Sequence, residues 1–108
     1  MRFVLQYDKR AIMKEAHRFF RSGKYGDFGD CLTKAWDNAR AYRELAELVG
    51  ETVRTWYGWV LNGREVIHDM VNVGQIRVWD ETTKSGQRVK SYFKFNQTCE
   101  LGTQEVKA

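Results

Sequence analysis

Apolar residues recur every three or four positions in two stretches of this sequence, and a glycine closes each stretch. This spacing is the period of an amphipathic helix, which must bury its apolar stripe against another element. It predicts a helix over Lys9–Ser22 and a longer one over Phe28–Val49. Gly23 and Gly50 then stand where a left-handed residue ends each helix.

The two helices are expected to pack against each other. Asp8 and Asp27 are suited to cap them, because a carboxylate accepts from the free amides of a first helical turn. The connection Lys24–Gly26 is so short that an αα-hairpin is the favoured arrangement. The apolar positions assigned to the helix contact are Ile12, Ala16, Phe19, Phe20, Phe28, Cys31, Leu32, Ala35, Ala39, Tyr42, Leu45, Ala46 and Val49, with Trp36 at the edge.

After Gly50 the sequence becomes rich in β-branched and aromatic residues, which favours strands. Asn62-Gly63 is a strong hairpin signal between two of them. The expected strands are Thr52–Leu61, Arg64–His68, Gln75–Asp80 and Gln87–Asn96, the last two paired across Lys84–Gly86.

The 108 residues are enough for one hydrophobic core and too few for two. We predict a single α+β domain in which a helical hairpin packs on an antiparallel sheet of about four strands. A short strand or extended arm, Met1–Tyr7, precedes the hairpin. Residues 1–50 are expected to be mainly helical and 51–101 mainly β, with 102–108 frayed.

No arrangement of residues predicts catalysis, so we expect a protein that is not an enzyme. The sequence holds no phosphate-binding glycine loop and no metal-spaced Cys or His pair, and no cofactor is expected. His68-Asp69 is the nearest approach to a catalytic pair, but a solvated turn pair is the favoured interpretation. Cys31 falls on an apolar helix face, where a thiol acts as a small hydrophobe.

The net positive charge of the chain comes from its first quarter. Seven basic and two acidic residues give residues 1–24 a charge of +5, whereas the remainder, with 11 basic and 12 acidic, carries −1. Such a distribution indicates an acidic partner, either nucleic acid or an acidic protein surface.

The first helix arranges these cations in one stripe by steps of three and four. A cationic stripe of this kind is able to follow phosphates or an acidic groove, although any surface helix is also polar outside. The candidate binding residues on this helix are Arg10, Lys14, His17, Arg18, Arg21 and Lys24.

Two further candidates lie in the β half. Arg88, Lys90, Tyr92 and Lys94 share one face of the last strand, a pattern that suits phosphate contact and base stacking or a solvated outer face. Strand alternation sets Trp56 on the face opposite Tyr57 and Trp59, which makes it the candidate for an exposed binding aromatic.

The segment Lys9–Arg40 resembles a module found in small proteins of phages, plasmids and conjugative elements. The resemblance rests on an Ile-Met-Lys-x-Ala-His start and a Phe-x-x-Cys-Leu-x-x-Ala-Trp second helix. The matching positions are Ile12, Met13, Lys14, Ala16, His17, Phe28, Cys31, Leu32, Ala35 and Trp36. The resemblance implies a bacterial mobile element as the source, and by analogy an anti-CRISPR or other anti-defence role.

We therefore expect an inhibitor that binds a host protein or ribonucleoprotein complex, a CRISPR effector being one candidate, with direct DNA or RNA contact left open. The alternative is a stand-alone nucleic-acid-binding accessory protein of the element. No apolar run approaches the ~18 residues of a membrane span, so no membrane contact is expected. Cysteines without a pairing pattern favour the reducing cytoplasm of the bacterial host. The oligomeric state is left open.

Overall fold

Both predicted helices are confirmed, as α1 (Lys9–Ser22) and α2 (Phe28–Val49). Their start sites follow from local chemistry. The Asp8 carboxylate accepts a hydrogen bond from the Ala11 amide at 3.0 Å. Asp27 caps α2 in a reciprocal capping box, which satisfies amides that have no partner within the helix.

Each helix ends at the predicted glycine. Gly23 has a φ of 70° and Gly50 a φ of 86°, a left-handed conformation that side chains with a Cβ rarely adopt. The amide of Gly23 returns to the Phe20 carbonyl and that of Gly50 to the Ala46 carbonyl. The turn after each helix is therefore determined by its own residues.

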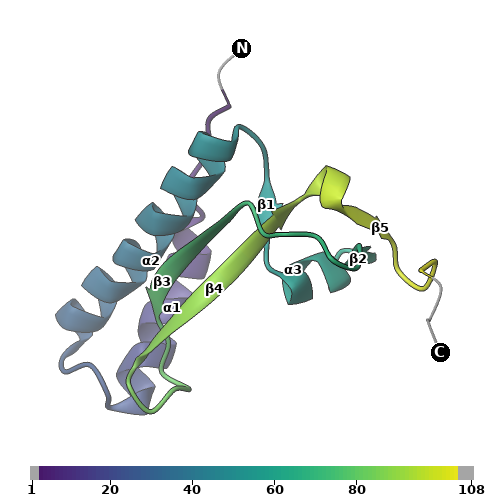
Figure 1. Ribbon diagram of the computed structural model, residues 1–108. Helices are drawn as coiled ribbons and strands as arrows, with labels where there is room; N and C mark the ends of the chain where they lie inside the picture. The colour runs from purple at the N-terminus through teal and green to yellow at the C-terminus, as the bar shows by residue number, and fades with distance from the viewer. Residues whose placement is uncertain (1–2, 105–108) are drawn as a thin grey trace.

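The computed structural model describes residues 3–104, and Figure 1 shows α1 and α2 side by side, with α2 packed on β3. Residues 3–7 form an extended arm and no strand, while Met1 and Arg2 of the predicted segment lie outside the described residues. The elements after α2 are β1 (Val53–Arg54), α3 (Trp56–Val60), β2 (Arg64–Val66), β3 (Gly74–Trp79), β4 (Gln87–Lys94), the 3-10 turn η1 (Phe95–Gln97) and β5 (Thr98–Glu100).

The helical hairpin is held by a core cluster along its contact. The buried members are Ile12, Ala16, Phe19, Cys31 and Ala35. Their burial confirms the predicted apolar faces of both helices, with one exception. Phe20 is 49% exposed, although its ring still contacts that of Phe28 at the first position of α2.

The α+β class with a helical hairpin on an antiparallel sheet is confirmed. β3 and β4 pair antiparallel as predicted, from Gly74 opposite Tyr92 to Trp79 opposite Gln87. β1 joins the other side of β4 at two residues only. A second core cluster, which includes Leu45 of α2, Val53 and Tyr92, binds this sheet to the helices.

The predicted strand Thr52–Leu61 is wrong. Only Val53 and Arg54 are in a strand, and Trp56–Val60 forms the helix α3. The reason is local: the Thr55 hydroxyl accepts from the Gly58 amide at 3.1 Å, which caps a helical turn. That turn buries Trp59, so capping and burial outweigh the β propensity of the aromatic residues.

The predicted hairpin at Asn62-Gly63 is also wrong, because β2 pairs with β5 and not with the preceding segment. β5 was not predicted. The end of the described chain is not frayed, since the Gln104 side chain bonds the Val66 carbonyl at 2.9 Å and the His68 amide at 2.7 Å. Residues 105–108 lie outside the described residues.

The molecule is flat and open for its length. Its radius of gyration is 15.6 Å and its principal extents are 48 × 40 × 20 Å, whereas a compact chain of about 100 residues has a radius near 13 Å. α1 packs on α2 and α2 packs on β3, but α1 has only sparse contact with the sheet. This arrangement leaves a groove between α1 and β4.

Candidate functional site

A row of basic residues lies along the exposed side of α1. We define the cationic ridge as Arg10, Lys14, His17 and Arg21, all of them exposed and spaced by four, three and four residues. Among residues 3–104, no acidic side chain forms an ion pair with Arg10, Lys14 or Arg21. Their charges are therefore available to a partner.

The middle of the ridge is slightly hollowed, and the His17 ring there packs on Phe28. A shallow depression of about 320 Å³ is lined by Lys14, His17, Arg18 and Arg21. The His17 ring lies 4.8 Å from the ring of Phe28, centroid to centroid. This contact fixes the imidazole between two cationic side chains.

Two predicted binding residues, Arg18 of α1 and Lys24 just after it, have structural contacts instead. Arg18 forms ion pairs with Glu15 at 3.4 Å and with Glu81 at 3.3 Å. The Lys24 ammonium donates to the Thr83 carbonyl. Both cations join the helical hairpin to the turn between β3 and β4, which is why neither Lys24 nor Arg18 is counted in the cationic ridge.

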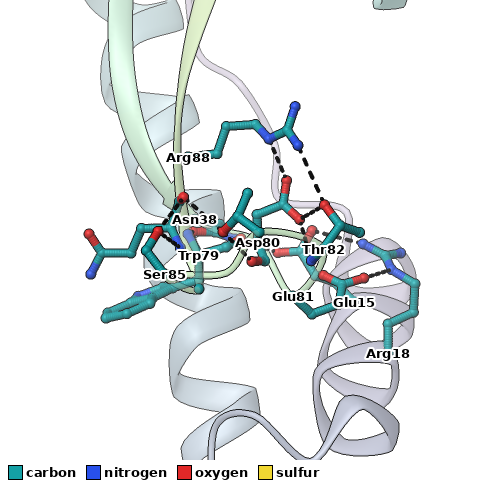
Figure 2. Close-up of polar contacts among 12 residues, drawn as sticks. Glu15, Arg18, Asn38, Trp79, Asp80, Glu81, Thr82, Ser85 and Arg88 are labelled. Carbon is teal, nitrogen blue, oxygen red and sulfur yellow. Dashed lines mark hydrogen bonds and ion pairs between the residues drawn. The ribbon is translucent and has the colours of Figure 1, made fainter.

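Figure 2 shows how a polar network ties the start of that turn to the helices. Asn38 of α2 is its centre: the side-chain amide accepts from the Trp79 amide at 2.8 Å and donates to the Trp79 carbonyl at 2.9 Å. It also donates to Glu15 at 2.8 Å. One side chain thus satisfies the outer backbone groups of β3 where the strand ends.

The other side of the turn is organised by Asp80. Its carboxylate accepts from the Thr82 amide at 2.9 Å and hydroxyl at 2.6 Å, and pairs with Arg88 at 2.9 Å. Partial burial alone would raise the pKa of Asp80, but the Thr82 hydrogen bonds and the charges of Arg88 and Lys90 lower it below its usual range. Arg88 is therefore partly committed to the fold.

Several predicted residues meet in the groove. It measures about 1390 Å³ and is bordered by the N-terminal arm, α1, α3 and β4. Of the predicted binding residues, those that line it are Arg18, Trp56, Arg88, Lys90 and Tyr92. Arg18 also lines the depression on the ridge, so the ridge and the groove adjoin at this residue, whereas Arg10 and Lys94 line neither.

The face shared by Arg88, Lys90, Tyr92 and Lys94 exists, but it is turned toward the helices. Tyr92 is only 8% exposed and its ring lies 5.5 Å from that of Tyr42. Burial, followed by the neighbouring Tyr42, raises the pKa of Tyr92 to about 12. Its assignment as an exposed stacking residue is therefore wrong.

Trp56 is 56% exposed, although it lies at the start of α3 and not on a strand. Tyr57 and Leu61, which lie on the same groove border, are also exposed. Trp59 has the opposite role: its indole nitrogen donates to the Phe93 carbonyl at 2.8 Å, inside the fold. The exposed aromatic pair of α3 is thus Trp56 and Tyr57.

No group of three metal-ligating His, Cys, Asp or Glu side chains is present within residues 3–104. His68 and Asp69 are exposed in a turn, where Asp69 has a φ of 66°. Cys31 is fully buried, and burial raises the pKa of its thiol. No helix in the described part of the chain has the length and apolarity to cross a membrane.

The sequence did not reveal three features of this region. They are the role of Asn38, the exposure of Tyr57 and Leu61, and the edge of β4 that β1 pairs with at two residues only. Asn38 bonds Trp79 across 41 positions of sequence, so no local spacing signals it.

Comparison with protein-family models, with curated proteins and with solved structures finds no match to this chain.

Proposed function

We propose that this protein is a non-enzymatic inhibitor that binds a nucleic-acid-handling defence complex in the cytoplasm of a bacterial host. The observation that supports it is the cationic ridge, in which Arg10, Lys14 and Arg21 are exposed and have no ion-pair partner among residues 3–104. From Arg10 to Arg21 the ridge spans about 16 Å at the helical rise of ~1.5 Å per residue. The resemblance of Lys9–Arg40 to mobile-element modules supports the choice of target.

The ridge suits an acidic surface on the partner protein. Exposed charges that need no rearrangement accelerate encounter with an oppositely charged surface and add specificity. The rings of His17 and Phe28 add a small apolar contact between the cations.

The experiment uses two variants of equal charge. Lys14→Glu with Arg21→Glu changes the ridge, and Arg77→Glu with Lys84→Glu changes exposed cations elsewhere. Each pair lowers the formal charge by four, from +4 to zero. Tagged forms are used to capture partners from a bacterial lysate, with and without nuclease, and the captured complex is assayed for nucleic-acid cleavage.

The wild type and the control pair should retain the same nuclease-resistant complex and stop its cleavage, while the ridge pair should lose both effects. Equal capture by the two variants, or cleavage that continues at saturating inhibitor, would contradict the proposal.

A second function is favoured by the depression that Lys14, His17, Arg18 and Arg21 line, since it could receive a phosphate. In that case the protein is a nucleic-acid-binding accessory factor. It would then bind naked DNA or RNA with an affinity that falls steeply with salt, and capture of proteins would end after nuclease treatment.

A further inference from the structure

β4 is paired on only one side along most of its length. β3 accompanies it from Gln87 to Tyr92, but β1 reaches its other side only at Phe93 and Lys94. An unpaired strand edge presents backbone donors and acceptors that another strand is able to bond.

The direction of the backbone groups follows from two hydrogen bonds. The Asp80 amide donates to the Gly86 carbonyl at 3.0 Å, and the Val73 amide donates to the Tyr92 carbonyl at 2.9 Å. Backbone groups of successive residues point to opposite sides of a strand. The even-numbered residues of β4 therefore bond β3, and the odd-numbered ones direct their N–H and C=O groups to the open edge.

The two ends of that edge are satisfied within the chain. The Gln87 carbonyl accepts from the hydroxyls of Thr83 at 2.9 Å and Ser85 at 3.1 Å. Phe93 pairs with Arg54 of β1, and its carbonyl accepts from the Trp59 indole.

Between these ends, Val89 and Ser91 have no backbone hydrogen-bond partner among residues 3–104. They present two donors and two acceptors in a row, and both residues line the groove. Part of the outer edge of β3 is unpaired too, at Gln75 and Arg77, but neither residue borders the groove.

The side chains beside this edge define what the added strand must carry. Lys90 lines the groove and has no ion pair among residues 3–104, whereas Arg88 is already paired with Asp80. On the opposite face, Val89 is 53% exposed, and Leu61, which caps the end of α3, contributes further apolar surface to the groove. Alternate positions of an added strand would therefore be acidic and apolar.

We propose that the groove binds an extended acidic segment of a partner protein, which adds to the sheet as a strand at Val89 and Ser91. Backbone bonds to these two residues supply affinity, and an acidic side chain opposite Lys90 supplies specificity. The inference goes beyond the proposed inhibition and does not depend on the ridge.

A second copy of this chain is a poorer occupant of the edge. Two copies of β4 could pair antiparallel through the backbone groups of their odd-numbered residues. In one such register Lys90 faces Lys90 of the other copy, and in another Arg88 faces Lys90. Like charges directly opposite each other in a sheet are unfavourable. The charge of this face thus favours a strand with acidic residues.

The test is a selection of random displayed dodecamer peptides on the full chain, with counter-selection on Ser91→Pro. Proline removes the Ser91 N–H, which bonds nothing in the sheet, and is tolerated on edge strands. The control Ser91→Ala removes only the hydroxyl, which accepts from the side-chain amide of Gln75 at 2.9 Å. Synthetic copies of the selected peptides are then titrated in hydrogen-exchange measurements.

We expect peptides with Asp or Glu at alternate positions that protect the amides of Val89 and Ser91 in the wild type and in Ser91→Ala. Lys90→Glu should weaken them at least about tenfold, and so should N-methylation of alternate peptide amides, which tests the backbone bonds without changing the protein.

Recovery of no peptide, of basic peptides, or of peptides that tolerate N-methylation would overturn the proposal. Sedimentation of a wild-type dimer that Ser91→Pro dissociates would assign the edge to a second copy. Protection of the two amides by a single-stranded oligonucleotide and not by peptide would assign it to nucleic acid. None of these results depends on Lys14 or Arg21, so failure here leaves the ridge proposal open to its own test.

Discussion

Lys14 and Arg18 lie one turn apart on α1 and are both exposed, yet among residues 3–104 only Arg18 has acidic partners. One partner, Glu15, lies on α1 itself, and the other, Glu81, comes from the turn between β3 and β4, which reaches one side of the helix and not the other. On the side that it reaches, the cations hold the turn in place. On the other side they keep their full charge for an external partner, so the role of each cation depends on what the rest of the fold brings to it.

The largest effect should come from removing the centre of the turn network. Asn38→Ala leaves the Trp79 amide and carbonyl without partners in a partly buried place. We expect the free energy of unfolding to fall by about 2–4 kcal/mol, because each such group costs about 1–3 kcal/mol. Urea unfolding at 25 °C measures it.

Asn62→Ala is the matched control, since its side chain makes one exposed hydrogen bond to the Gly58 carbonyl. It should cost less than about 1 kcal/mol. An equal loss in the two variants would show that the network does not anchor the turn.

Asp80→Asn should have a smaller effect that depends on pH. At pH 7 we expect a loss of about 1–2 kcal/mol, because Arg88 and Thr82 lose a charged acceptor. The lowered pKa of Asp80 means that the folded state favours its ionised form. The stabilisation is therefore complete above the ordinary carboxyl pKa and is lost as the pH falls through the lower pKa of the folded state.

Urea unfolding at pH 7 and in steps toward pH 2 measures this. The wild type and the exposed control Glu44→Gln should lose the same acid-dependent component, which Asp80→Asn should lack. Parallel pH profiles in all three proteins would contradict the assignment.

The smallest expected change in stability tests the comparison between Arg18 and Lys14 directly. Arg18→Gln should lower the free energy of unfolding by about 0.5–1 kcal/mol, the usual range for ion pairs that are half exposed. Lys14→Gln should change it by less than about 0.3 kcal/mol, because Lys14 pairs with nothing among residues 3–104. If Lys14→Gln were the more damaging of the two, the division of α1 into a structural and a free side would be wrong.

The helical half was predictable because its determinants are local. Caps at Asp8 and Asp27, the apolar period and the terminal glycines all act within a few residues of one another. The pairing of β3 with β4 belongs to the same class, since a short turn connects the strands.

The errors fall where distant residues decide. Trp59 is buried against a strand 34 positions later, and this contact makes a helical turn preferable to a strand. The alternation of β4 was predicted correctly, but not which face meets the helices. Because α1 has only sparse contact with the sheet, the helix-facing side of β4 is open enough to carry a charged residue, Lys90, at the groove. A prediction that turns the charged face of β4 toward solvent therefore assigns the wrong face to the helices.

The burial of Cys31 gives the helical hairpin a chemical reporter of its own opening. A thiol must be both accessible and ionised to react. Burial shields the Cys31 thiol from reagents, and it raises the pKa of this thiol, which disfavours the reactive thiolate. Cys99, which is only half-buried in β5, should react first with an alkylating reagent. The slower alkylation of Cys31 then measures how often α1 separates from α2, without any change to the sequence.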